Sequence, residues 1–401
     1  MINFETDEFR KEINLNKKKQ INFKDNLEID VLSKKVNVII GGTPSRKIRS
    51  YYGGKNLWVS IQQMNGKEIN DTKEKITEEA VENSNVKLVK KGTTLLSFKL
   101  SIGKTAIAGK DLYTNEAIAG LEVKPEFRKE ILDKYLFLFF SSNFMKQLLI
   151  KSNNVFGSSL NKPFIENIKI PFPKIEIQKK IVSESEEIQK KEIGNEIKIK
   201  ELSKKVSNII NGLKWNNDMK IGDLCVTSSG GTPLTSKRDY YENGVIPWLT
   251  SGEVKNGLIK NTRQKITDLG LKNSSAKIFP KKTVLVAMYG ATAGQVGILD
   301  IESSTNQAIC GIIPNDKIDS KYLYYYLLQQ TNNLLDIRTG VARPNLSQDK
   351  IQNFKIPLPS IKLQKEIVSD IEKIETEINK VKEENKNLEL EKDEIIKKYL
   401  L

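Results

Sequence analysis

The sequence contains no histidine and only two cysteines, Cys225 and Cys310, among 401 residues. The absence of histidine removes the usual general base near neutral pH, any triad built on histidine and the commonest metal ligand. The two cysteines have no metal-ligand spacing, so neither a disulfide framework nor a zinc site is indicated. We therefore expect no metal site, and any catalysis would have to use carboxylates or lysines.

Long hydrophobic runs are also missing. The longest apolar burst is YLFLFF, from Tyr135 to Phe140, and it is far too short to span a bilayer. The first residues, MINFETDEFRKEIN, are polar and acidic and do not have the apolar core of a signal peptide. These features predict a cytoplasmic protein without a membrane partner.

Positive charge is in excess, with 65 Lys and Arg against 50 Asp and Glu and a formal net charge of +15. Proteins this basic often bind polyanions, because neutralising phosphates releases condensed counterions. The chain is also rich in lysine, isoleucine and asparagine overall, and a lysine-rich composition gives a positive net charge even in a protein that binds no polyanion. Charge alone therefore leaves nucleic-acid binding as one of two interpretations.

An internal repeat is the strongest pattern in the chain. The stretch GGTPSRKIRSYYGGKNLW at 41–58 is matched by GGTPLTSKRDYYENGVIPW at 230–248, and TNEAI at 114–118 by TNQAI at 305–309. The last matching blocks are NIKIPFPKIEIQKKIVSE at 167–184 and NFKIPLPSIKLQKEIVSD at 353–370. Since the blocks recur in one order, two tandem copies cover about 31–213 and 220–401. Residues 1–30 stand outside the repeat, and their role is left open.

Each copy is expected to be a mixed region of short strands and one helical segment, followed by a long helix after a pair of prolines. The helix pattern alternates apolar spacings of three and four, which is typical of a left-handed coiled coil about 60 Å long. The predicted seam and docking residues are Ile181, Ile188, Ile199, Leu202, Val206, Ile367, Ile371, Ile374, Ile378 and Val381. We expect the two helices to pair antiparallel, because a globular module joins them.

Polar residues interrupt this seam at Ser185, Glu192, Asn195, Asn385 and Lys392. They could fix the register of the pair, face helices of another protein, or be ordinary interruptions near solvent.

Two short motifs suggest catalysis but are incomplete. SIGKT, Ser101 to Thr105, resembles the end of a phosphate-binding loop, but the required first glycine is replaced by Phe98. Asn161-Lys-Pro-Phe164 resembles the Asn-Pro-Pro-Phe motif of adenine methyltransferases, in which Asn holds the amine of a flipped base. Neither pattern recurs in the second copy, and we expect no catalytic residues.

The repeated Gly-Thr-Pro regions instead favour a binding surface. Framework residues agree between the copies, and the paired tyrosines and the tryptophans are expected to pack more often than to stack on bases. The polar tips differ, which suits a protein that reads two short sequences through phosphate and base-edge contacts. The candidate DNA-binding residues are Arg46, Lys47, Arg49, Lys55, Gln62, Gln63, Lys104, Asn161, Lys237, Arg238, Thr250, Ser251, Arg263, Arg338, Arg343 and Asn345.

From about Val31 onward, the order and content of these repeated blocks make the sequence resemble a specificity subunit of a type I restriction–modification enzyme. The resemblance is carried by the paired Gly-Thr-Pro, Tyr-Tyr and Trp blocks, the Thr-Asn-(Glu/Gln)-Ala-Ile blocks and the Ile-Pro-(Phe/Leu)-Pro helix starts. The family's Glu-Gln pair at the helix start is Ile177-Gln178 and Leu363-Gln364 here, which puts in doubt only local helix contacts.

The resemblance implies an α+β fold with two tandem similar target recognition domains separated by two long antiparallel coiled-coil helices. The implied organisation is an N-terminal extension at 1–30, recognition domains at 31–173 and 214–359, and long helices at 174–213 and 360–401. It also implies a non-catalytic subunit that reads a bipartite site in double-stranded DNA and docks two modification subunits, with restriction subunits added. S-adenosylmethionine, ATP and magnesium would then be bound by those partners, with no cofactor on this chain.

Two other classes remain open at this point. One is a coiled-coil scaffold that ignores DNA, and the other is a single-chain methyltransferase or nuclease with an unrecognised motif.

Overall fold

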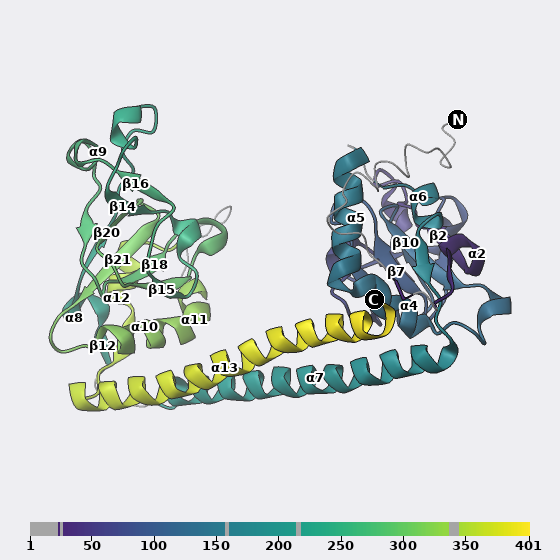
Figure 1. Ribbon diagram of the computed structural model, residues 1–401. Helices are drawn as coiled ribbons and strands as arrows, with labels where there is room; N and C mark the ends of the chain where they lie inside the picture. Colours follow the sequence, from purple (N-terminus) through teal and green to yellow (C-terminus); the bar gives the residue numbers. More distant parts are fainter. Residues whose placement is uncertain (1–22, 25–26, 157–159, 214–217, 337–344) are drawn as a thin grey trace. The chain divides into compact units, whose positions relative to one another are not determined.

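The computed structural model describes residues 23–24, 27–156, 160–213, 218–336 and 345–401 (Figure 1). The chain forms two compact units, one ending at Asn195 and completed by Glu383–Leu401, the other spanning Glu196–Lys382. Each unit therefore contains one α+β domain and a part of each long helix. The long helices are α7 (Ile175–Asn211) and α13 (Ile361–Leu400).

The first unit is built on two sheets, with strand orders β2-β10-β7-β8-β4 and β5-β3-β9-β6. The strands of the first sheet are β2 (Val36–Ile40), β10 (Ile118–Val123), β7 (Thr94–Ser97), β8 (Thr105–Ala108) and β4 (Glu68–Ile69). Those of the second are β5 (Glu74–Ile76), β3 (Tyr52–Val59), β9 (Leu112–Thr114) and β6 (Leu88–Val89). The helical segments are α2 (Leu32–Lys35), η1 (Arg49–Tyr51), η2 (Ile61–Gln63), α3 (Glu78–Glu82), η3 (Pro125–Phe127), α4 (Asp133–Ser141), α5 (Asn143–Phe156) and α6 (Lys162–Glu166).

The second unit repeats this topology, with strand orders β13-β21-β18-β19-β15 and β16-β14-β20-β17. Its first sheet contains β13 (Cys225–Ser229), β21 (Ile309–Pro314), β18 (Val284–Ala287), β19 (Val296–Leu299) and β15 (Gly257–Ile259). Its second contains β16 (Gln264–Ile266), β14 (Ile246–Leu249), β20 (Ser303–Thr305) and β17 (Ile278–Phe279). The helical segments are α8 (Ile221–Leu224), η4 (Arg238–Tyr240), η5 (Ser251–Glu253), α9 (Asp268–Lys272), η6 (Gly290–Thr292), α10 (Ser320–Gln329), α11 (Thr331–Asp336) and α12 (Gln348–Asn353). The duplication seen in the sequence is thus a duplication of the fold.

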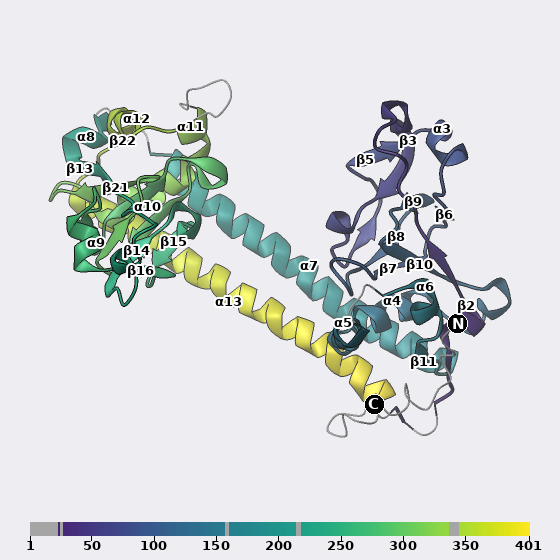
Figure 2. The same ribbon diagram turned by 90° about the horizontal axis from the view of Figure 1, so that it is seen from above.

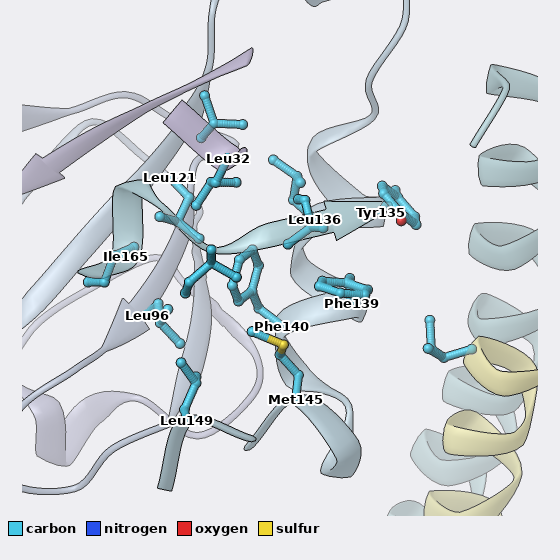
Figure 3. Packing of buried hydrophobic residues seen from close by; sticks show 14 of the residues in the cluster. Leu32, Leu96, Leu121, Tyr135, Leu136, Phe139, Phe140, Met145, Leu149 and Ile165 are labelled. Atoms are coloured by element: carbon cyan, nitrogen blue, oxygen red, sulfur yellow. The ribbon is translucent and has the colours of Figure 1, made fainter. Parts of the chain in front are cut away.

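One buried cluster of the first unit lies between its five-stranded sheet and α4, where Tyr135, Leu136, Phe139 and Phe140 are fully buried (Figure 3). The rings of Phe139 and Phe140 meet edge to face at 5.5 Å, an arrangement that aromatic pairs prefer. The apolar burst of the sequence is therefore a short buried helix that covers a sheet.

The N-terminal segment adds a strand to the first unit. Strand β1 (Ile29–Val31) pairs antiparallel with β11 (Lys169–Pro171), just as β12 (Asp218–Lys220) pairs with β22 (Lys355–Pro357) in the second unit. The backbone N–H of Lys24 donates to the carbonyl of Leu400 at 3.0 Å. The described part of residues 1–30 thus completes the first domain and contacts the end of α13.

The two long helices run antiparallel within each unit. In the first unit, Asn195 on α7 bonds to Asn385 on α13 at 2.9 Å, and Glu192 pairs with Lys392. In the second unit, Lys198 on α7 lies 2.8 Å from Glu377 on α13. Figure 2 shows the ribbons of α7 and α13 running alongside each other. The descending numbers on α13 establish the antiparallel direction. Four of the polar seam residues therefore pair with each other across the helices, while Ser185 is buried.

The predicted apolar seam residues are buried or half-buried. Those that are buried are Ile181, Ile188, Leu202, Val206, Ile367, Ile371 and Val381, while Ile199, Ile374 and Ile378 are half-buried. Ile181 and Ile188 belong to the core of the first domain, and Ile367 and Ile371 to that of the second. The seam therefore serves both helix pairing and the attachment of each domain to its helix.

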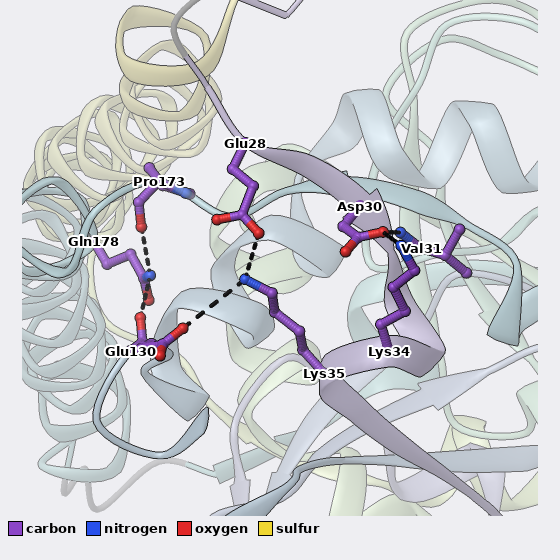
Figure 4. A network of polar contacts seen from close by, with 8 residues as sticks. All are labelled: Glu28, Asp30, Val31, Lys34, Lys35, Glu130, Pro173 and Gln178. Carbon is purple, nitrogen blue, oxygen red and sulfur yellow. Dashed lines mark hydrogen bonds and ion pairs between the residues drawn. The ribbon is translucent and has the colours of Figure 1, made fainter. Parts of the chain in front are cut away.

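A buried glutamine attaches each domain to the helix that follows it. The amide of Gln178 donates to the carbonyls of Glu130 and Pro173 at 2.8 and 2.7 Å (Figure 4). Its Oε1 accepts from the N–H of Leu132 at 2.9 Å. Gln364 does the same in the second unit, with the carbonyls of Lys317 and Pro359 and the N–H of Asp319. Both side chains are fully buried, so three backbone groups in each unit depend on one amide.

We predict that Gln178→Leu destabilises the first unit by about 2 kcal/mol, because three backbone groups, one of them in a buried hydrogen bond, lose their partner. Thermal unfolding and hydrogen exchange at the amide of Leu132 measure the effect. The matched control is Gln189→Leu, since Gln189 lies on the same helix but is exposed, and its effect should stay within about 0.5 kcal/mol. Equal losses for the two variants would show that the buried amide does not anchor the domain.

Candidate nucleic-acid interface

A tryptophan anchors the Gly-Thr-Pro loop in each domain. Trp58 on β3 and Trp248 on β14 are almost completely buried. Each indole N–H donates to a glycine carbonyl of the loop, that of Gly42 or Gly231, at 3.0 Å. A buried indole needs such an acceptor, and the loop provides it at the same place in both copies.

The second tyrosine of each pair holds the loop from the other side. The hydroxyl of Tyr52 donates to the carbonyl of Pro44 at 2.7 Å, and that of Tyr241 to the carbonyl of Pro233 at 2.5 Å. Tyr52 also meets the ring of Trp58 edge to face, with centroids 6.3 Å apart. The repeated aromatic residues are therefore packing residues of the loop.

Close backbone contact explains the paired glycines. A Cβ on Gly41 would come within 2.2 Å of Oγ1 of Thr114, and one on Gly230 within 2.1 Å of Thr305. The next glycine in each copy donates its N–H to the carbonyl of the same threonine at 2.8 Å. The Gly-Thr-Pro and Thr-Asn-(Glu/Gln)-Ala-Ile blocks are thus the two halves of one structural frame, which only glycine permits.

The basic residues on this frame differ in whether their side chains already have an acidic partner within the domain. Arg46 forms a two-pronged pair with Glu74, and its guanidinium lies 4.5 Å from the centroid of the Tyr52 ring. This hydrogen-bonded pair holds the pKa of Glu74 below its usual value. Lys47 and Arg49 are exposed. Arg46, predicted as a DNA contact, is therefore neutralised within its own domain, whereas its two neighbours are available to a phosphate.

The second domain presents a similar basic turn. Lys237 and Arg238 are exposed at the start of η4, and Nζ of Lys237 lies 5.4 Å from the ring of Tyr240. Lys55 in the first domain extends further into solvent, with 83% of its side chain exposed and Nζ 3.7 Å from Glu78. Arg263 is also exposed, and its backbone N–H donates to Glu253 at 2.8 Å.

The polar turn after each tryptophan is a capping box. In the first domain, Oε1 of Gln63 accepts from the N–H of Ser60 at 3.3 Å. In the second, Glu253 accepts from both the N–H and the hydroxyl of Thr250, at 3.0 and 2.8 Å. Gln63 and Thr250, predicted as DNA contacts, are thus engaged in shaping the turn. Gln62 is exposed and Ser251 half-exposed at its surface.

The remaining candidates lie on separate loops. Lys104 is exposed in the turn between β7 and β8, and Asn345 is exposed before α12. Asn161 caps α6, because its Oδ1 accepts from the N–H of Phe164 at 2.9 Å, which gives the Asn-Lys-Pro-Phe pattern a structural explanation. Arg338 and Arg343 lie outside the described residues.

Some of these partners could not be found from the sequence. Glu74 is 28 residues from Arg46, and no local pattern joins them. Gln178 and Gln364 do recur in the matched blocks, and that recurrence was an available signal for the buried anchor.

Each α+β domain has the same frame but different accessible polar residues around it, which we call the rim. The rim includes Lys47, Arg49 and Gln62 in the first domain and Lys237, Arg238 and Ser251 in the second. The two copies thus define a duplicated recognition module. The sequence profile described as "Type I restriction modification DNA specificity domain" matches residues 34–202 and 213–392. Because these matches cover most of the chain, the protein belongs to that family. The expected fold class, with two tandem similar domains and two long antiparallel helices, is confirmed.

Curated relatives agree with this assignment. The chain is 27% identical over 168 residues to the EcoR124I/EcoR124II specificity subunit of Escherichia coli, a match that covers 41% of this chain and 42% of that protein. It is 25% identical over 351 residues to the MjaIX specificity subunit of Methanocaldococcus jannaschii, covering 80% of both chains. The match to the first of these thus spans less than half of that protein's length.

A solved structure shows the same fold. A chain from a structure of the type I R-M system, described in terms of complex assembly and conformational transition, matches with a TM-score of 0.59 and 16% identity. The match covers 95% of this chain and 99% of that chain. The duplicated fold is therefore shared with a protein of very different sequence.

We predict that Asn161→Ala lowers the stability of the first domain by about 1 kcal/mol through loss of the helix cap. Asn161→Ser should restore most of that stability, because a serine hydroxyl caps a helix equally well. Thermal unfolding and DNA affinity are measured on the same preparations. If both variants lost DNA affinity equally while only one lost stability, Asn161 would be a DNA contact.

Proposed function

We propose that this chain is the DNA-reading subunit of a type I restriction–modification complex, in which each domain reads one half of a bipartite duplex site. The observation that carries the proposal is the contrast within each domain between a constant frame and a variable rim. The Trp-to-glycine, Tyr-to-proline and Gly-to-threonine contacts are the same in both copies. The exposed residues on the frame differ, so the two copies suit two different half-sites.

Phosphate contacts are proposed at the exposed basic residues of the two turns. Arg49 and Arg238 occupy equivalent places, at the first position of η1 and η4. Both turns are fixed at their ends by the buried tyrosines Tyr51 and Tyr240. A cation on a fixed turn loses little conformational entropy on binding, which favours a specific phosphate contact over a diffuse one.

We further propose that the chain is non-catalytic and that the chemistry belongs to other subunits. Burial raises the pKa of both Cys225 and Cys310 to about 12, which leaves neither thiol as a ready nucleophile. Among the described residues, no group of three or more Cys, Asp or Glu side chains could hold a metal ion.

No helix in the described ranges combines the length and the apolarity needed to cross a membrane.

The proposed partners follow from the family and from the helices. Family membership supports assembly with other restriction–modification subunits, and we propose that two modification subunits dock on the helices α7 and α13. S-adenosylmethionine, ATP and magnesium are then proposed for those subunits. The scaffold alternative leaves the differing rims of the two domains without a role, so we favour the DNA-reading function.

Arg49→Ala and Arg238→Ala should each weaken DNA binding by the assembled complex and reduce its salt slope by about one, because each removes one phosphate contact. The duplex is one that the assembled complex selects from a pool of random sequences, and binding to it is measured at several salt concentrations. Lys129→Ala serves as a control, since Lys129 is exposed in the same unit as Arg49 but away from its turn. Unchanged slopes would remove these arginines from the interface.

The enzymatic alternative is tested by incubating the chain with duplex DNA and labelled S-adenosylmethionine. We expect no methyl transfer by the chain alone and transfer once its co-purifying subunits are added. Transfer by the highly purified chain alone would support the single-chain methyltransferase instead.

A further inference from the structure

The turn between β7 and β8 presents a leucine directly to solvent. The side chain of Leu100 is 91% exposed, more than any other large apolar side chain among the described residues. Its backbone also has a φ of +60°, in the left-handed region that bulky side chains rarely adopt. Both its exposure and its backbone conformation are therefore unfavourable for a leucine.

The second copy shows that the turn does not need this leucine. Leu96 pairs with Thr105 across β7 and β8, and Val286 pairs with Val296 across β18 and β19. The second turn is one residue longer, and counted from β7 and β18 Leu100 corresponds to Gly290, whose φ is +72°. Glycine adopts that conformation without cost, so the leucine is unnecessary for the fold. An unfavourable residue that the fold does not require indicates a contact with another molecule.

The turn that carries Leu100 is held rigidly. Ser97 is fully buried, and its hydroxyl accepts from the N–H of Lys104 at 2.9 Å and donates to the carbonyl of Ser101. The N–H of Gly103 donates to the carbonyl of Ser97 at 2.9 Å. A Cβ on Gly103 would lie 3.3 Å from Cγ of Lys146, so the turn rests on α5. The leucine is thus pre-positioned and loses little entropy on binding.

The neighbours of Leu100 indicate what it contacts. Lys99 precedes it, and the exposed Lys104 follows at the end of the same turn. A rigid apolar tip between two lysines matches the proteins that insert a leucine or another apolar wedge between base pairs while cations hold the flanking phosphates. In the second domain the equivalent turn offers Tyr289, which is only 38% exposed, and Gly290.

We propose that Leu100 inserts as a wedge between adjacent base pairs of the half-site bound by the first domain, with Lys99 and Lys104 on the neighbouring phosphates. This proposal rests on the proposed DNA-reading function and adds an element of indirect readout to it. Base steps that unstack easily are favoured at that position, although no hydrogen bond reads them.

The test uses the full chain assembled with its co-purifying subunits and the duplex that this complex selects. The fluorescent base 2-aminopurine is placed in turn at each step of the first half-site. With the unsubstituted chain, fluorescence should rise at one step because the wedge unstacks it. Leu100→Gly should abolish that rise and weaken binding about ten-fold or more, with an unchanged salt slope. Leu100→Phe should retain both the rise and the affinity.

The matched control is Leu88→Ala, which removes another exposed leucine of the same domain, 40% accessible on β6, and should change neither quantity. Normal affinity and fluorescence in Leu100→Gly would overturn the proposal. A loss of affinity with the fluorescence rise intact would place Leu100 in a groove, and failure of the subunits to assemble would assign it to a protein contact; either result rejects the wedge. If the unsubstituted complex selects no DNA motif, the proposed function itself fails.

Discussion

A buried amide at the start of each long helix is the interaction on which the rest of this structure depends. Gln178 and Gln364 are themselves fully buried, and each satisfies three backbone groups of its unit. The groups lie in the segment before the core helix of the domain and in the proline-rich segment before the long helix. An unsatisfied buried amide or carbonyl is costly, so the domain and its helix are held in one arrangement. Apolar packing alone would hold them with less geometric specificity.

Within each domain attached in this way, the structural contacts of the frame are separate from the exposed residues of the rim. The frame of Gly, Trp, Tyr and Thr contacts is dense and nearly identical in the two copies, and the exposed side chains of rim residues such as Lys47 and Arg49 are not part of those contacts. Rim residues can then differ between the copies without disturbing the fold, as the exposed turns around Arg49 and Arg238 do. A protein that reads two half-sites needs this separation between residues that build and residues that bind.

The sequence allowed the duplication, the long helices and the family to be predicted, because each leaves a regular signal. The repeat is visible in ordered blocks, and the helices in the alternation of apolar residues such as Ile367, Ile371 and Ile374. It did not allow the assignment of individual polar residues. Arg46 is paired with Glu74, Gln63 and Thr250 shape a turn, and Asn161 caps a helix. These roles depend on hydrogen-bond partners, some of which are brought together only by folding.

The same division applies to the chain as a whole. Two copies of one module, each followed by an apolar-striped helix, can be read from residue order alone, because periodicity and repetition are properties of that order. The folded chain is needed to see that Asn195 bonds to Asn385, that Gln178 lies buried, and that Leu100 is exposed on a rigid turn. Burial and hydrogen-bond partners depend on distances between residues far apart in the chain, and the order of residues does not contain those distances.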